Sequence, residues 1–213
     1  MRTRASRAEQ VGRNRSAVLL AARRVFLARG YAGATLDGIA EEAGFSKGVV
    51  YSQFASKADL FMALLEERIG ERAAENERIV ADVAGAAGLH ALLRNFEADS
   101  RAEAGWARLL VEFRTVALRD PELSRRYARA HARTVELLAG MLGQLHARAG
   151  LRPAVPPRTM AELILALGAG VTLERAADPD ALPSAALTEM VLSGLGFAPV
   201  RERVATRLRK VAR

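Results

Sequence analysis

Apolar residues recur every three or four positions along most of the chain, which is the period of an amphipathic α-helix. No segment shows the strict alternation that a half-buried strand requires. Helix start and stop signals divide the pattern into about nine helices. They are expected over 15–29, 35–43, a short stretch after Ser46, from Ser56 to about 83, 89–103, 105–118, 121 to about 150, 158–177, and a last one ending near 194. The sequence therefore predicts an all-α fold.

The stretch 35–54, TLDGIAEEAGFSKGVVYSQF, reads as two short helices joined by a tight turn. Thr35 is expected to cap the first helix through its hydroxyl, and Asp37 places a negative charge in its first turn. Gly44 suits the left-handed position at which the first helix ends. Ser46 is expected to cap the second helix, whose inner face is Val49 or Val50 together with Phe54.

The second helix of this pair is too short to be stable by propensity alone, so it must be held by packing on its inner face. Its outer face then stays free to enter a groove, as in helix-turn-helix proteins that read duplex DNA. An ordinary helical hairpin is the competing interpretation of the same pattern.

The distribution of charge favours contact with DNA. Residues 1–57 carry ten basic and four acidic groups, a net charge of +6, whereas residues 58–196 carry a net charge of −3. The last 17 residues, 197–213, carry +5. A basic excess confined to one module is the footprint expected of phosphate binding. Two of the three lysines, Lys47 and Lys57, flank the second short helix.

Residues 15–61, RSAVLLAARRVFLARGYAGATLDGIAEEAGFSKGVVYSQFASKADLF, resemble the N-terminal DNA-binding domain of the tetracycline-repressor (TetR) family of bacterial transcription regulators. The resemblance implies an N-terminal three-helix helix-turn-helix domain followed by a C-terminal helical domain for ligand binding and dimerisation. The expected divisions are a DNA-binding domain with a basic arm (1–56), an effector-binding and dimerisation domain (57–196) and a basic tail (197–213). The last two helices of the second domain are expected to form a homodimer, which suits a palindromic operator.

The resemblance also identifies residues that would contact double-stranded DNA. Gly48 would allow close approach of the backbone, Val49 would touch a thymine methyl, and Lys57 would bind the phosphate backbone. Tyr51 is either a DNA contact or buried against the first helix. Gln53 stands where many relatives have histidine, and its side chain can hydrogen-bond either a phosphate or the edge of an adenine. The complete set of expected DNA contacts is Thr35, Ser46, Lys47, Gly48, Val49, Tyr51, Gln53 and Lys57.

A small-molecule effector, largely apolar, is expected to bind among the middle helices, because ligand pockets are mostly apolar with a few polar groups. The residues expected to line its pocket are Phe96, Trp106, Leu110, Phe113, Tyr127 and His131, each of which is alternatively plain core. Effector binding would shift the fourth helix and change the separation of the two helix-turn-helix domains in the dimer. A repressor would then be released from its operator.

Other functional classes receive little support. The three histidines lack metal-ligand spacing and no catalytic motif is present, so we expect no enzyme activity, metal or cofactor. The absence of cysteine is compatible with a cytoplasmic location, and the longest apolar run is too short to span a membrane. The alternative function is a basic helical membrane-surface or scaffold protein without sequence-specific DNA binding.

The two ends of the chain remain open to more than one interpretation. An arm with Arg2, Arg4, Arg7 and Arg13 is either a minor-groove contact or a solvated tail. The tail at 197–213 is a capping helix, a membrane-seeking helix or a second DNA contact.

Overall fold

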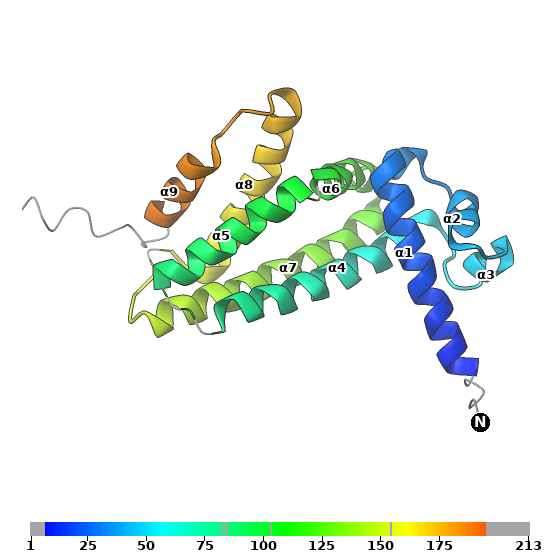
Figure 1. Cartoon of the computed structure of the whole chain (residues 1–213), viewed down its shortest axis with the longest axis horizontal. Helices are drawn as coiled ribbons and strands as arrows, with labels where there is room; N and C mark the ends of the chain where they lie inside the picture. The colour runs from blue at the N-terminus through cyan, green and yellow to red at the C-terminus, as the bar shows by residue number, and fades with distance from the viewer. Residues whose placement is uncertain (1–6, 82, 84, 103, 154, 195–213) are drawn as a thin grey trace, which may run out of the picture. The chain divides into compact units, whose positions relative to one another are not determined.

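The computed structural model describes residues 7–194 except 82, 84, 103 and 154, and this part of the chain forms nine α-helices (Figure 1). In chain order they are α1 (Arg7–Gly33), α2 (Leu36–Ala43), α3 (Lys47–Tyr51), α4 (Lys57–Val80), α5 (Gly85–Ala102), α6 (Ala104–Ala117), α7 (Pro121–Arg148), α8 (Pro157–Ala177) and α9 (Ser184–Gly194). The all-α prediction is confirmed.

Two helices begin earlier in the chain than predicted. Helix α1 begins at Arg7 rather than near Arg15, because the polar residues before Arg15 continue the helix without a capping signal. Helix α5 begins at Gly85, where the sequence predicted a break extending past Gly88. Gly88 is buried instead, and a Cβ there would lie 2.5 Å from a Leu145 methyl, so close packing accounts for this glycine.

Side chains of nearby residues cap the starts of α4 and α7. The Ser56 hydroxyl donates to Asp59 Oδ2 (2.7 Å) and accepts from the Asp59 amide (3.0 Å) at the start of α4. At the start of α7, Asp120 Oδ1 accepts from the amides of Glu122 (2.9 Å) and Leu123 (3.0 Å). These bonds satisfy amides that have no partner within their own helix.

The chain packs into two compact units. One takes Met1–Ala74 and Ser100–Thr134, and the other takes Glu75–Asp99 and Val135–Arg213. Helices α4, α5 and α7 each contribute residues to both units, and the predicted functional domains at 1–56 and 57–196 stay a prediction. The predicted DNA-binding head (α1–α3) is therefore packed together with α6 and the first part of α7.

The core of the first unit is aromatic. Phe26, Phe61 and Phe113 are fully buried, and the rings of Phe61 and Phe113 stack with centroids 4.1 Å apart. Tyr31 packs edge-on against Phe61 (5.4 Å) and Phe113 (5.0 Å). Because these rings come from α1, α4 and α6, the cluster joins the head directly to α6.

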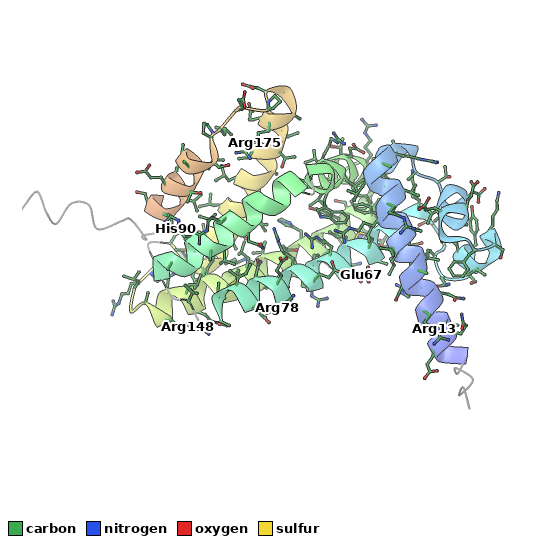
Figure 2. All side chains as sticks on the ribbon, viewed as in Figure 1. Arg13, Glu67, Arg78, His90, Arg148 and Arg175 are labelled. Carbon is green, nitrogen blue, oxygen red and sulfur yellow. The ribbon has the colours of Figure 1, made fainter. Side chains whose placement is uncertain are left out.

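The second unit has its own apolar core, with Leu89, Leu142, Leu145 and Met160 buried. His146 is also buried in this unit, and its Nδ1 donates to the Leu142 carbonyl (2.8 Å). Arg148, labelled in Figure 2, donates to the carbonyls of Val80 (2.9 Å) and Ala81 (3.1 Å) at the end of α4. No helix within the described ranges has both the length and the apolar character needed to cross a membrane.

Candidate nucleic-acid interface

The turn between α2 and α3 is built as the sequence predicts. Thr35 Oγ1 accepts a hydrogen bond from the Gly38 amide (3.1 Å), and Gly44 adopts φ +71°. The amides of Gly44 and Phe45 donate to the carbonyls of Glu41 and Ala40, both at 3.0 Å. This Schellman pattern ends α2 and reverses the chain, so that α3 starts beside α2 (Figure 1).

Helix α3 is held on one face and open on the other. Val50 and Phe54 are buried, and the Arg15 guanidinium lies 4.7 Å from the centre of the Phe54 ring. The opposite face presents the exposed residues Ser46, Lys47, Gly48 and Tyr51, beside the half-buried Val49. The alternative in which Tyr51 is buried against α1 is wrong, because 51% of Tyr51 is exposed.

A hydrogen-bonded group connects the outer faces of α2 and α3. The Lys47 ammonium forms an ion pair with Asp37 Oδ2, and the Tyr51 hydroxyl donates to Asp37 Oδ1 (3.3 Å). The hydrogen bond to Lys47 lowers the pKa of Asp37, and the same bond raises the pKa of Lys47. The sequence identified Asp37 only as a charge in the first turn of α2, so this link was missed.

Neither the space around residue 48 nor its backbone conformation requires glycine there. A Cβ at this position would meet only the Ser46 hydroxyl, at 3.9 Å, and φ is in the ordinary range for a helix. Glycine within a helix is less favourable than alanine by about 1 kcal/mol. Its presence on the open face of α3 is explained if a large partner must approach the backbone there.

Lys57 is held by the protein itself. Its ammonium donates to the carbonyls of Tyr31 (2.7 Å), Ala34 (2.9 Å) and Ala32 (3.2 Å), and lies 4.6 Å from the centre of the Tyr31 ring. Burial lowers the pKa of Lys57. Three donor bonds use the full capacity of an ammonium group, so in this structure the side chain stabilises the end of α1.

Two other expected contacts take unexpected positions. Ser46 occupies the residue before α3, but its hydroxyl makes no capping bond, so this predicted cap is wrong. Ser46 is instead exposed on the open face of α3. Gln53 Nε2 donates to the Val49 carbonyl (3.3 Å), while Gln53 Oε1 is buried with no partner among the described atoms. Gln53 is thus turned toward the protein.

The basic N-terminal segment is partly helical. Arg7 and Arg13 lie within α1, and Figure 2 labels Arg13 on the ribbon of this helix. Residues 7–14 are therefore helical rather than an irregular tail, and a minor-groove contact by Arg7 and Arg13 stays a prediction. Arg2, Arg4 and the tail at 197–213 lie outside the described residues.

Most of the residues predicted to line an effector pocket come together, but as packed core. Phe113 is fully buried, and Tyr127 packs against Phe113 (6.0 Å) and His131 (6.0 Å). Trp106 stacks on Phe61 with centroids 6.1 Å apart, and Leu110 packs against the same cluster. Phe96 lies in α5, and its side chain is outside what the structure describes.

One hollow adjoins this cluster. It has a volume of about 210 Å³ and is lined by residues of α1, α4 and α6, among them Leu19, Arg23, Leu64, Arg68 and Trp106. Among the predicted effector residues whose side chains the structure describes, Trp106 lines this hollow.

A contact from α6 to the exit of α1 was missed by the sequence. Glu112 accepts from the Tyr31 amide (2.9 Å), directly after Gly30, which has φ +68°. A Cβ at Gly30 would lie 2.7 Å from Glu112 Oε2. The pattern marked Gly30 as a helix end, but it held no signal that a carboxylate 81 positions away would close on it.

Comparisons with known proteins agree with this arrangement. Residues 18–64 match the family described as bacterial regulatory proteins, tetR family, and residues 85–196 match the C-terminal domain described as a BetI-type transcriptional repressor. The first match covers α2 and α3 with parts of α1 and α4, and the second covers α5 to α9.

Individual relatives are similar over about a third of this chain or less. The chain is 46% identical over 55 residues to the transcriptional activator FasR of Mycolicibacterium smegmatis, covering 26% of this chain and 25% of FasR. It is 39% identical over 70 residues to the repressor AcnR of Corynebacterium diphtheriae, covering 32% of this chain and 37% of AcnR. The chain thus aligns with well under half the length of these relatives.

A solved structure is similar over most of the fold. The regulator FadR of Bacillus subtilis, in complex with stearoyl-CoA, has a TM-score of 0.67 and 19% identity, covering 86% of this chain and 99% of FadR. At this identity, the likeness concerns the fold alone.

Proposed function

Because the chain belongs to the TetR family of bacterial regulatory proteins, we propose that it is a sequence-specific DNA-binding repressor, released from a palindromic operator by a small-molecule effector. The observation that carries the proposal is the open face of α3. Ser46, Lys47, Gly48 and Tyr51 are exposed on a helix whose other face is buried, and Gly48 has no explanation within the fold.

The recognition step follows from this geometry. Helix α3 enters the major groove with its open face, where Gly48 allows close approach and Val49 meets an apolar base edge such as a thymine methyl. Thr35, Ser46, Lys47 and Tyr51 contact the phosphates around it.

Two of the expected contacts take modified roles. Lys57 contacts a phosphate through its main-chain amide at the start of α4, because its ammonium is held by α1. Gln53 reaches the DNA only if its side chain turns outward.

A homodimer is the proposed form that binds DNA. Leu163 and Leu173 on α8 and Met190 on α9 are 56%, 55% and 54% exposed. Large exposed apolar side chains on these two helices support an interface there, and a two-fold dimer presents two copies of α3 to two half-sites. The last two helices therefore form the proposed dimer contact.

The effector is proposed to act on the aromatic cluster between α4 and α6. Trp106 lines the hollow and stacks on Phe61, so a ligand that moves Trp106 also disturbs the packing of α4. Phe96, Leu110, Phe113, Tyr127 and His131 complete the proposed set. The effector shifts the equilibrium because it binds the two arrangements of α4 and α6 with different affinity.

The experiment that tests the proposed function is selection of bound sequences from a random duplex pool, followed by binding measurements on the selected site. We expect a palindromic motif and binding that random duplex competes poorly. A pool that shows no enrichment, with equal affinity for all duplexes, would reject sequence-specific regulation. A transcription assay on the selected site then distinguishes repression from activation.

A further inference from the structure

Lys47 and Tyr51, on the open face of α3, already bind an anion that the protein itself supplies. Asp37 accepts from the Lys47 ammonium through Oδ2 and from the Tyr51 hydroxyl through Oδ1. The side chains of Lys47 and Asp37 are 67% and 45% exposed, so the whole group lies at the surface. It joins α2 to α3 on the side that the proposed function assigns to DNA.

A carboxylate and a phosphate accept hydrogen bonds from the same donors, such as the Lys47 ammonium and the Tyr51 hydroxyl. Each offers negatively charged oxygens that accept from an ammonium and from a phenol, and the two anions repel each other at close range. Lys47 therefore cannot neutralise a DNA phosphate fully while Asp37 remains bound to it. Because the ion pair is exposed, it is weak enough to be exchanged on binding.

The position of Asp37 strengthens the comparison with a phosphate. It lies in the first turn of α2, where free amides favour any anion, two residues after Thr35, itself a proposed phosphate contact. A carboxylate at this place opposes the approach of the DNA backbone, whatever its sequence. By contrast, the side-chain bonds of Asp37 within the described residues go to Lys47 and Tyr51, and not to the proposed base-reading positions Gly48 and Val49.

We propose that Asp37 determines specificity by acting as an internal substitute for a DNA phosphate, which holds Lys47 and Tyr51 in the free protein and weakens binding to DNA of any sequence. Stable binding then requires the base contacts that only the operator provides. The inference rests on the proposed function, because it assumes that the open face of α3 meets DNA.

The salt dependence of binding measures this exchange. Each phosphate that a protein neutralises steepens the slope of log K against log salt by about 0.9. Replacing Asp37 by Asn removes the charge and frees Lys47. We therefore expect D37N to bind random-sequence duplex about two- to fivefold more tightly, with a slope steeper by about 0.9.

Matched variants separate this effect from a general change in charge. E41Q removes one negative charge from the exposed surface of the same helix, and it should change the affinity less and leave the slope nearly unchanged. D37E retains the carboxylate and should behave as the wild type. The double variant D37N/K47A should not show the tighter DNA binding of D37N, because that tighter binding depends on the Lys47 ammonium.

The experiment is fluorescence anisotropy on the full-length protein, with a labelled random-sequence duplex and with the selected operator, over a range of salt concentrations. Weaker binding by D37N would overturn the proposal and make Asp37 a positioning residue, and equal behaviour of D37N and E41Q would also overturn it. If D37N fails to melt cooperatively, K47A in the wild-type background decides. With random-sequence duplex, where Asp37 still holds Lys47, the proposal expects K47A to flatten the slope of log K against log salt by well below about 0.9, and a full loss of about 0.9 rejects it.

Failure of the two proposals is distinguishable. A wild-type protein that binds no duplex rejects the proposed function. A wild-type protein that binds and a D37N variant that gains nothing reject only the role of Asp37.

Discussion

The Glu112 carboxylate on α6 accepts a hydrogen bond from the main-chain amide of Tyr31 at the exit of α1, with 2.9 Å between Oε2 and the amide nitrogen. Lys57 of α4 binds the Tyr31 carbonyl in the same short segment. Two helices, α4 and α6, therefore hold one short segment at the end of α1 through its main-chain atoms.

Replacing Glu112 by Ala removes this acceptor and leaves a partly buried amide without a partner. We expect a loss of about 1–3 kcal/mol in the free energy of unfolding, measured by urea denaturation. The E112Q variant is the control, since its amide oxygen still accepts from Tyr31, and it should lose less. Equal stability of E112A and the wild type would show that solvent replaces the carboxylate.

Gly48 provides a test in which stability and DNA binding change in opposite directions. G48A should raise stability by about 0.5 kcal/mol, because a Cβ fits in open space and alanine favours the helix. The same Cβ should weaken DNA binding about tenfold or more by blocking close approach. Thermal melting and anisotropy on the operator measure the two effects.

Gly70 in α4 offers the matched control. It is exposed and a Cβ there would meet nothing within 4 Å, so G70A should stabilise the protein similarly. Its affinity for DNA should be unchanged. If G48A binds as tightly as G70A, the close approach of DNA to α3 is wrong.

Lys57 separates a structural role from a phosphate contact. Replacing it by Ala removes three bonds to the end of α1, and we expect a loss of about 1–3 kcal/mol in stability. The slope of log K against log salt should stay nearly constant, because the ammonium is held by the protein. A slope reduced by about 0.9 would instead place the side chain on a DNA phosphate.

The features that the sequence predicted correctly depend on residues close together in the chain. Thr35 caps an amide three residues later, and Gly44 ends the helix it follows. Each of these depends on backbone geometry within one helical turn, which residue type and spacing specify directly. The buried face of α3 follows from the same periodicity.

The features that the sequence missed depend on the packing of distant segments. Lys57 has the residue type of a phosphate ligand, and only the fold brings the carbonyls of Tyr31 and Ala34 to its ammonium. Glu112 reaches Tyr31 from another helix in the same way. Trp106 and Phe113 were expected around a pocket, yet aromatic spacing on a helix is equally compatible with a filled core.

Asp59 gives a dependence of stability on pH. The Ser56 hydroxyl, and then Arg126 at 2.7 Å, lower the pKa of Asp59 below its ordinary value of 3.8. A lowered folded-state pKa stabilises the protein above pH 3.8, and this contribution is lost as the pH falls through the folded-state pKa. D59N should therefore melt at a lower temperature near neutral pH.

The difference in melting temperature between D59N and the wild type should narrow on acidification from about pH 5 to about pH 2, as measured by circular dichroism. The E41Q variant, which lacks another exposed carboxylate, controls for the change in net charge. A difference that stays constant over this range would exclude the ionised form of Asp59 as the stabilising one.

The proposed dimer contact is tested by a charge on α8. Leu163 is 56% exposed in the single chain, and L163D would place a carboxylate within the proposed interface. Because an unpaired buried charge is strongly unfavourable, we expect L163D to dissociate to monomers, as measured by light scattering. A monomer binds only one half-site at a time, so the operator affinity should fall about tenfold or more. Leu118, just after α6 and 79% exposed, provides the control, and L118D should keep both the mass and the affinity of the wild type. Dimers of L163D with unchanged DNA binding would place the interface elsewhere, and L118D monomers would move it to the end of α6.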